Sequence, residues 1–361
     1  MKIIISAGGT GGHLYPALAF VQYIEKQRTD VEFLFVGTTD RLEASVVPEM
    51  GYAYHGLYVK GFVGNPVQKI KNGMIFVKSV VEAKKVIKKF KPDIVVGFGG
   101  YPSASIVLAA SQMKIKTLIH EQNSLIGLTN KILINKVDGI VCCYQKTYDL
   151  LPKEKTYLYG NPRAGYIDLE PIDIYEKYQI DRNKKIVLIV MGSLGSASVN
   201  KVMKEVLTKL QNKPYTILYA SGKSYYEQLQ NELGVLANNI CLVPYIEDML
   251  HVLKETSLIV CRGGASTLAE ITTYGVPGII IPSPYVVYNH QEFNARALVE
   301  RDAARMILEA DLTGEYCANQ IDELIQDESI LEMLKQNALS LGKPNASKDM
   351  YEFMLKIIGD K

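Results

Sequence analysis

The chain has 361 residues, of which 48% are hydrophobic and 22% charged, a normal balance for a globular protein. That length exceeds one ordinary core and predicts two domains. The net charge of +2 hides an asymmetry: residues 1–160 carry 20 Lys and Arg against 12 Asp and Glu, whereas the other 201 carry 20 against 26. The basic first part predicts an anionic partner. We expect a membrane surface or a phosphorylated substrate rather than nucleic acid, because interleaved aromatic and basic motifs are not evident.

The five cysteines show no Cys-x-x-Cys spacing, so we expect buried, reduced thiols of a cytosolic protein rather than disulfides or metal ligands. Met1 and Lys2 lead directly into an apolar run, without the pattern of a leader peptide. No apolar run approaches about 18–20 residues, and we therefore expect no membrane-spanning segment.

Short apolar strands alternate with helical patterns along the whole chain. The strands predicted in the first half are Ile3–Ser6, Glu32–Val36, Tyr54–Gly56, Ile94–Gly97, Thr117–His120, Ile140–Cys143 and Thr156–Tyr159. Those predicted in the second half are Ile186–Met191, Thr216–Ala220, Ile240–Val243, Leu258–Cys261, Gly278–Ile281 and Arg305–Leu308. This alternation predicts an α/β protein of right-handed βαβ units, with parallel sheets covered by helices on both faces.

The turn Gly160-Asn161-Pro162-Arg163 interrupts this pattern and marks the predicted domain boundary. We expect an N-terminal domain at 1–162 and a C-terminal domain at 163–343. The segment 344–361 predicts one more helix, which we expect to pack back on the N-terminal domain. The residues on one face of that helix are Met350, Phe353, Met354 and Ile357.

The first predicted strand runs into Ala7-Gly8-Gly9-Thr10-Gly11-Gly12-His13 and then into a helix. Glycines allow close approach of a bulky or anionic group, and a helix N-terminus adds N–H donors and partial positive charge. The spacing is neither Gly-x-Gly-x-x-Gly nor Gly-x-x-x-x-Gly-Lys. Such a turn alone is weak evidence of a ligand site, but His13 adds a titratable group to it.

Other polar or glycine-rich loops also follow predicted strands, where open parallel sheets bind their ligands. These loops are Gly97–Tyr101, His120–Asn123, Gly160–Arg163, Met191–Ser196, Arg262–Glu270 and Asn289–Glu292. Their joint occurrence predicts that two such domains facing each other bind a ligand in a cleft between their strand-end loops.

The run from Arg262 to Thr267 suits a diphosphate, because glycines, hydroxyls and a helix N-terminus coincide there. Glu270, one turn later, could accept hydrogen bonds from both hydroxyls of a ribose. The alternative is purely local: Ser266 or Thr267 caps the helix, and Glu270 completes a capping box with Thr267.

Taken together, these motifs resemble the MurG family, the bacterial UDP-N-acetylglucosamine:lipid I (undecaprenyl-pyrophosphoryl-MurNAc-pentapeptide) N-acetylglucosaminyltransferases of peptidoglycan synthesis. The motifs that carry the resemblance are Gly-Gly-Thr-Gly-Gly-His, Gly-Gly-Tyr, His-Glu-Gln-Asn, Gly-Asn-Pro, Gly-Ser-x-Gly, Arg-Gly-Gly-Ala-Ser-Thr-x-x-Glu and Asn-His-Gln. The resemblance covers essentially the whole chain. It implies a GT-B architecture, with two Rossmann-like domains whose parallel sheets face each other across a cleft.

The resemblance also implies an inverting enzyme without cofactor or metal, which transfers N-acetylglucosamine to the MurNAc 4-hydroxyl of lipid I to form lipid II. Expected donor-site residues are Thr10, Gly11, Gly12, Asn123, Arg163, Ser193, Arg262, Ser266, Thr267, Glu270, Asn289 and Gln291. Expected acceptor-site residues on the N-terminal domain are His13, Tyr101, His120 and Asn123, and the catalytic candidates are His13, His120 and Glu121.

Inverting transfer needs a base for the acceptor hydroxyl and stabilisation of the departing diphosphate. His13 is our candidate base, since an ordinary histidine pKa of about 6.5 suits proton transfer near neutral pH. His120 is the rival base, and His13 could instead donate a hydrogen bond to a phosphate. Ser266, Thr267, the helix N-terminus and Arg262 would stabilise the leaving group. No Asp-x-Asp pair stands at a strand end, so we expect no metal.

Nine lysines and one acidic residue lie between Lys60 and Lys91. A helix over Met74–Lys91 would place Phe76, Val80, Ala83, Ile87 and Phe90 toward the core. We expect the remaining apolar and basic side chains to dock peripherally on anionic lipid at the cytoplasmic face of the bacterial plasma membrane. This expected membrane patch comprises Phe62, Met74, Val77, Lys78, Val81, Lys85 and Lys89. The alternative is a solvated face whose lysines serve solubility.

Three other functions remain open on the residues alone: another glycolipid glycosyltransferase, a UDP-GlcNAc epimerase, or a nucleotide-sugar-binding module without activity. The resemblance favours a role in cell-wall biogenesis, and with it in cell shape, the cell cycle and division. Its implied partners are UDP-GlcNAc, lipid I and other cell-wall synthesis or division proteins, without nucleic acid.

Overall fold

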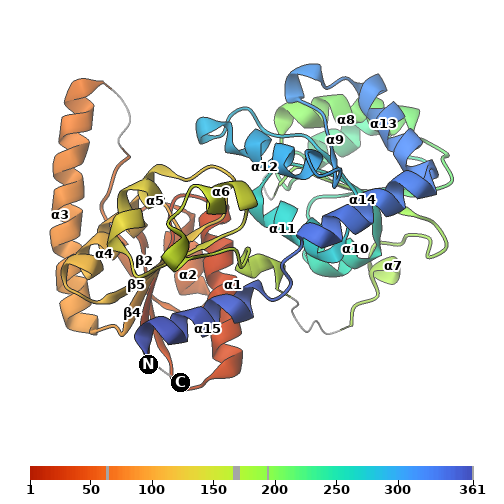
Figure 1. The fold of residues 1–361 in the computed structure, drawn as a ribbon. Coiled ribbons are helices and arrows are strands. Elements are labelled where there is room, and N and C mark those ends of the chain that lie inside the picture. Colours follow the sequence, from red (N-terminus) through yellow and green to blue (C-terminus); the bar gives the residue numbers. More distant parts are fainter. Residues whose placement is uncertain (62–64, 166–170, 193–194, 360–361) are drawn as a thin grey trace. The chain divides into compact units, whose positions relative to one another are not determined.

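The computed structural model describes residues 1–61, 65–165, 171–192 and 195–359 (Figure 1). The chain divides into two compact units, Met1–Gly165 with Lys343–Lys361, and Tyr166–Gly342. The boundary predicted after residue 162 lies close to Gly165, where the first segment of the first unit ends. The predicted C-terminal segment belongs to the same unit.

The first unit is built on a seven-stranded parallel sheet with the order β3-β2-β1-β4-β5-β6-β7. Its strands are β1 (Lys2–Ser6), β2 (Glu32–Thr38), β3 (Ala53–Leu57), β4 (Ile94–Gly97), β5 (Lys116–Glu121), β6 (Gly139–Cys142) and β7 (Thr156–Tyr157). Its helices are α1 (Gly11–Gln27), α2 (Leu42–Glu49), α3 (Pro66–Phe90), α4 (Tyr101–Gln112), α5 (Leu128–Leu133), α6 (Gln145–Asp149) and α15 (Ala346–Ile358).

Alternate side chains of the central strands enter two separate cores, as the two-residue period of a strand requires. Ile3 and Ile5 pack in one cluster with apolar residues of α1 and α15. Ile4 lies in the other cluster, with residues of α3, α4 and α5. Both faces are therefore covered by helices, which explains why these strands are apolar throughout.

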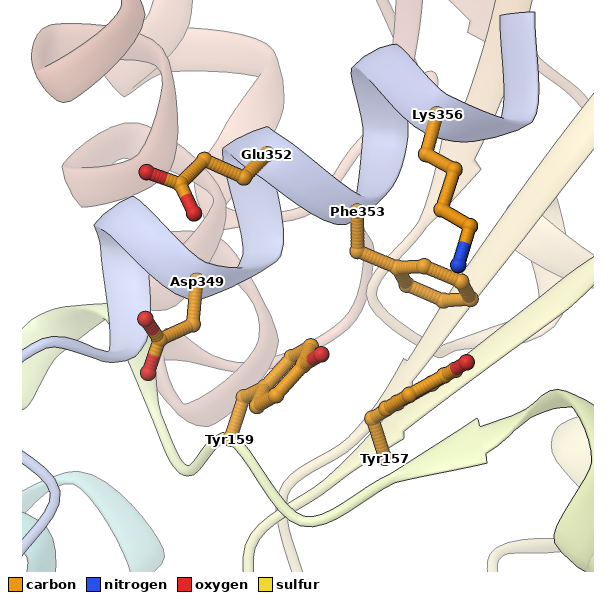
Figure 2. A pocket seen from close by; sticks show the side chains of 6 residues that line it. All are labelled: Tyr157, Tyr159, Asp349, Glu352, Phe353 and Lys356. Carbon is orange, nitrogen blue, oxygen red and sulfur yellow. The ribbon is translucent and has the colours of Figure 1, made fainter.

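The C-terminal helix α15 packs at the β7 edge of this sheet through Phe353 (Figure 2). The Phe353 ring centroid lies 4.3 Å from that of Tyr157 and 6.2 Å from that of Tyr159. A pocket of 210 Å³ lies beside these rings, and none of the predicted site residues lines it. Its lining residues are Tyr157, Tyr159, Asp349, Glu352, Phe353 and Lys356.

The second unit is built on a six-stranded parallel sheet with the order β10-β9-β8-β11-β12-β13. Its strands are β8 (Ile186–Val190), β9 (Thr216–Ala220), β10 (Ile240–Val243), β11 (Thr256–Cys261), β12 (Gly278–Ile280) and β13 (Arg305–Met306). Its helices are α7 (Ile174–Lys177), α8 (Ala197–Lys209), α9 (Tyr226–Leu233), α10 (Met249–Glu255), α11 (Ala265–Tyr274), α12 (His290–Val299), α13 (Gly314–Gln326) and α14 (Glu328–Leu341).

One core of the second unit forms between the sheet and α8, α9, α13 and α14. The helix α11 lies against the sheet near Gly278, where an added Cβ would come within 3.5 Å of both Ile271 and Ile259. Each predicted strand overlaps a strand of the structure, although β7 and β13 end two residues earlier than predicted.

No helix among the described residues combines the length and apolarity needed to cross a bilayer. The five cysteines are free thiols. Cys142, Cys261 and Cys317 are buried as predicted, whereas Cys143 and Cys241 are partly exposed.

Candidate functional site

The glycine-rich loop after β1 lies next to the loop after β4, because these strands are neighbours in the first sheet. The backbone N–H of Phe98 donates to the Ser6 carbonyl at 2.7 Å, which extends the strand pairing into the loops. Thr10 and Gly12 are exposed and Gly11 is partly exposed. The start of α1 can therefore be reached by a ligand.

His13 lies in the first turn of α1, with its ring against Gly99. An added Cβ at Gly99 would lie 2.7 Å from the ring, and Gly99 has a φ of +108°, so glycine is required there on both grounds. Nδ1 of His13 lies 2.8 Å from the Gly8 carbonyl oxygen, which can only accept a hydrogen bond. Nδ1 therefore carries the proton, and in the neutral ring Nε2 is the unprotonated nitrogen.

His120, the rival base, is fully buried at the end of β5. Its Nε2 lies 3.0 Å from the Gly160 carbonyl oxygen, and its ring centroid lies 5.3 Å from that of Phe98, with the two rings tilted by 37°. Burial lowers the pKa of His120 to about 4, so this ring is neutral at physiological pH.

Glu121 binds backbone and side-chain groups of the loop that follows β5. Its carboxylate accepts hydrogen bonds from the Gly127 N–H at 2.8 Å, the Asn130 amide at 2.8 Å and the Asn123 N–H at 3.1 Å. Burial raises the pKa of Glu121, and these donors oppose that rise. These contacts favour a role in holding the loop over direct catalysis.

The other predicted residues of the first unit follow three different strands, β4, β5 and β7. Asn123 is partly exposed, and its carbonyl accepts a hydrogen bond from Thr147 at 2.9 Å. Tyr101 begins α4, and an added Cβ at Gly61 would lie 2.4 Å from its hydroxyl oxygen. Arg163 is partly exposed after β7, and its backbone N–H donates to the Asn161 side chain at 3.0 Å.

In the second unit, α11 begins at Ala265 with Gly264 as its N-cap, and no side chain caps it. The alternative in which Ser266 or Thr267 caps the helix is therefore wrong, because both residues already lie in its first turn. The Ser266 hydroxyl is buried without a hydrogen-bond partner among the described residues. The first turn carries no acidic residue, so the N-terminus of α11 retains its positive end for an anion.

Glu270 and Arg262 flank this helix start. Glu270 is 5% exposed. The pKa of Cys261 is raised to about 12, mainly because the thiol is buried and to a lesser extent because of the nearby Glu270 carboxylate. Arg262 forms a buried ion pair with Glu309 at 2.6 Å and donates to the Ser196 hydroxyl at 2.7 Å. The guanidinium of Arg262 is therefore engaged by the protein itself, which favours positioning of the loop before α8.

Asn289 and Gln291 lie at the start of α12, which packs onto the Gly263 loop. An added Cβ at Gly263 would lie 2.3 Å from the Gln291 carbonyl oxygen. The Gln291 side chain accepts from the Ser283 N–H at 2.9 Å, and Asn289 adopts a left-handed backbone with φ of +51°. Ser193 lies outside the described residues.

The membrane patch predicted on α3 is solvent-exposed where the structure describes it. Met74, Val77 and Val81 are 58%, 62% and 53% exposed, and Lys78, Lys85 and Lys89 are exposed as well. The helix begins at Pro66, earlier than predicted, and this extension adds Val67 and Ile70 at 74% and 68% exposure. Phe62 lies outside the described residues.

Comparison with known proteins matches both units. The glycosyltransferase family 28 N-terminal domain matches residues 3–142, and the family 28 C-terminal domain matches residues 186–350. The chain is 41% identical to the UDP-N-acetylglucosamine--N-acetylmuramyl-(pentapeptide) pyrophosphoryl-undecaprenol N-acetylglucosamine transferase of Bacillus pumilus, over 99% of each chain. The transferase of the same name from Listeria monocytogenes is 40% identical over 99% of this chain and 100% of its own.

Among solved structures, MurG of Acinetobacter baumannii superposes with a TM-score of 0.79 and 27% identity, covering 98% of this chain and 99% of that one. The chain belongs to the MurG family. Its two parallel-sheet units are the two Rossmann-like domains of the GT-B fold.

Two acids of this MurG-family chain, the buried Glu43 and the partly buried Glu309, are not indicated by the sequence motifs. Glu43, at the start of α2, accepts a hydrogen bond from the Gly9 N–H at 3.1 Å. Glu309 pairs with Arg262 and accepts from the Ser198 hydroxyl at 2.7 Å. The sequence signal for both is poor, since an acid near a helix start is ordinarily a favourable surface charge.

The low pKa of His120 predicts an acid-sensitive first unit. In the unfolded chain a histidine of pKa about 6.5 takes up a proton between pH 6.5 and 4, whereas folded His120 stays neutral down to about pH 4. The free energy of unfolding should therefore decrease as the pH is lowered from 6.5 to 4. His120 should contribute up to about 1.4 kcal/mol per pH unit to this decrease. Urea unfolding of wild type and His120→Gln between pH 4.5 and 7 measures this slope.

The free energy of unfolding of the variant should change less with pH than that of wild type, whatever the variant's stability at pH 7. His290→Gln, a partly exposed histidine of the second unit, is the matched control and should keep the wild-type slope. Equal slopes for His120→Gln and wild type would refute the assignment.

Proposed function

We propose that this chain transfers N-acetylglucosamine from UDP-GlcNAc to the MurNAc 4-hydroxyl of lipid I, forming lipid II for the cell wall. The observation that carries the proposal is the 41% identity, over 99% of both chains, to a transferase named for this donor and acceptor. An epimerase or an inactive sugar-binding module would share the fold but does not account for that likeness. The proposed reaction inverts the anomeric carbon and requires no metal.

The proposed roles follow the two units. His13 takes the proton of the acceptor hydroxyl through Nε2, which the contact between Nδ1 and Gly8 leaves unprotonated in the neutral ring. His120 is the weaker candidate, because it is fully buried and its pKa is near 4. Tyr101, His120 and Asn123 would shape the acceptor site, and Glu121 would hold its loop.

On the second unit, the first turn of α11 with Ser266 and Thr267 would bind the donor diphosphate and stabilise it as it leaves. Glu270 would bind the ribose, and Asn289 and Gln291 the sugar. Arg262 would position Ser196 at the start of α8, and Ser193 would bind near the nucleotide phosphates. Thr10, Gly11, Gly12, Asn123 and Arg163 would complete donor binding from the first unit.

We further propose that the enzyme docks on anionic lipid at the cytoplasmic face of the membrane through α3. The exposed apolar side chains there lie among lysines, and a polyprenyl-linked acceptor requires access to the bilayer. Other proteins of cell-wall synthesis or division are the expected macromolecular partners.

The transfer itself is tested by UDP release from UDP-GlcNAc, with and without a short-chain lipid I analogue and with chelator present. Wild type should release UDP only with acceptor, and His13→Ala should be about 10²–10⁴-fold slower while UDP binding persists. His55→Gln, a histidine on β3 outside the site, should keep the wild-type rate.

The outcomes separate the alternatives. Conversion of donor without acceptor indicates an epimerase, and tight UDP binding without release indicates a binding module. Unchanged turnover in His13→Ala would refute the role of His13 as base. Activity that is lost with chelator and restored only by added metal would refute metal independence.

The role of Glu270 is tested with paired ligands. Glu270→Gln removes the charge that would accept both ribose hydroxyls, and hydrogen bonds to charged groups contribute about 1.5–3 kcal/mol. Calorimetry should show about 10–100-fold weaker binding of UDP and little change for 2′,3′-dideoxy-UDP. An equal loss for both nucleotides would instead identify Glu270 as a structural residue.

The lipid surface is tested by co-sedimentation with vesicles that contain phosphatidylglycerol. The triple variant Lys78→Glu, Lys85→Glu, Lys89→Glu should lose binding, because each basic residue contributes about 1 kcal/mol near such a surface. The same charge change at the exposed residues Lys201, Lys209 and Lys335 of the second unit is the control and should retain binding. Unaltered binding by the first triple variant would remove this proposal.

A further inference from the structure

The peptide group between Gly8 and Gly9 is hydrogen-bonded on both sides. Its N–H, from Gly9, donates to Oε2 of Glu43 at 3.1 Å. Its carbonyl, from Gly8, accepts from Nδ1 of His13 at 2.8 Å. A peptide group is a planar, conjugated unit, so Glu43 and His13 are joined through a single delocalised group.

Glu43 is held firmly in this arrangement. It is 1% exposed, and its other oxygen accepts from the Thr38 N–H at 3.0 Å and the Thr38 hydroxyl at 2.8 Å. All of these partners are donors, which is the environment of an ionised carboxylate. The pKa of Tyr54 is raised, mainly by burial and to a lesser extent by the nearby Glu43 and Asp40 carboxylates.

We propose that Glu43 is a positioning residue that fixes the tautomer of His13 and raises its basicity through the Gly8–Gly9 peptide. The carboxylate draws the Gly9 N–H toward itself, which increases the negative charge on the Gly8 carbonyl oxygen. Hydrogen bonds in such chains polarise and strengthen one another. The carbonyl therefore holds the Nδ1–H of His13 more tightly and stabilises the ring when Nε2 takes up a proton.

This arrangement is a carboxylate–histidine pair with a peptide group between its members. A directly bonded carboxylate orients a catalytic imidazole and stabilises the imidazolium that forms. Here the loop backbone transmits the effect, so the base and the glycine loop are positioned together. His120 on β5 also interacts electrostatically with His13.

The catalytic consequence of this proposal depends on the proposed role of His13 as base, whereas the coupling itself does not. The two are therefore measured separately, by ¹⁵N NMR of the imidazole rings and by acceptor-dependent UDP release. The chain has only five histidines, which keeps the ring spectra simple to assign.

The test variant is Glu43→Gln, which keeps the shape of the side chain and removes its charge. The pKa of His13 should fall by about one pH unit, the lower end of the effect of a directly adjacent charge. The Nδ1-protonated tautomer should lose population. The kcat should fall about tenfold with an unchanged KM for UDP-GlcNAc, the lower end of the loss when the hydrogen-bond partner of a metal-ligating histidine is removed.

Two control variants distinguish coupling from general damage. Glu82→Gln removes a carboxylate whose Oε1 lies 3.2 Å from Nε2 of His55, and it should alter the ring signals of His55 but not those of His13. Thr38→Val removes one bond to Glu43 but keeps the Gly9 contact, and it should leave the His13 tautomer unchanged.

Unchanged His13 signals in a folded Glu43→Gln protein would overturn the proposal. If that variant does not fold, Glu43→Asp decides, because its shorter side chain weakens the contact with the Gly9 N–H. The pKa of His13 should then fall part of the way, and His13 signals identical to those of wild type would overturn the proposal. A changed pKa with unchanged kcat would support the coupling and refute the base role.

Discussion

Backbone groups beyond the carboxyl edge of a parallel sheet have no strand partner, and this constraint shapes both candidate sites. Buried N–H and C=O groups must be paired, whereas loops at a sheet edge leave the ladder. In the first unit, the Phe98 N–H still pairs with the Ser6 carbonyl beyond the strands. Further along the β1 loop, the side chains of Glu43 and His13 bind the Gly9 N–H and the Gly8 carbonyl.

Buried or partly buried carboxylates provide much of this support. Glu43 binds Gly9, Glu121 binds Gly127, and Glu309 engages the loop of Ser196 through Arg262 and Ser198. Burying a carboxylate costs several kcal/mol unless its lone pairs are satisfied, so each acid restricts the conformations its loop can adopt. The loops are thereby organised before any ligand arrives, which is the condition for electrostatic stabilisation of a transition state.

The fold was largely predictable because its strands are apolar runs bounded by glycine and polar loops. Ile94–Gly97 and Thr216–Ala220 coincide with β4 and β9, and the loops after them follow from parallel topology. The contacts within the site were less predictable. Gly9 meets Glu43 only because β2, which leads into α2, pairs with β1.

Arg262, in the second unit, is another residue whose contacts could not be predicted from the sequence. Its place before a helix N-terminus suggested a phosphate ligand, and the sequence gives no sign that Glu309, after β13, neutralises it. The helix start at Ala265 was likewise hidden, since Thr267 and Glu270 have the spacing of a capping box. Local patterns identify loops, whereas long-range pairing decides which of their groups meet a ligand.

The placement of the acids also separates the electrostatics of the two units. Glu43 occupies the Gly9 N–H and puts a negative charge beside the glycine loop, which disfavours an anion at Gly9 and favours a protonated His13. The first turn of α11 has no acidic residue, and its positive end favours a diphosphate. Proton acceptance on the first unit and leaving-group stabilisation on the second are the two demands of the proposed transfer. Each unit is electrostatically suited to one of them.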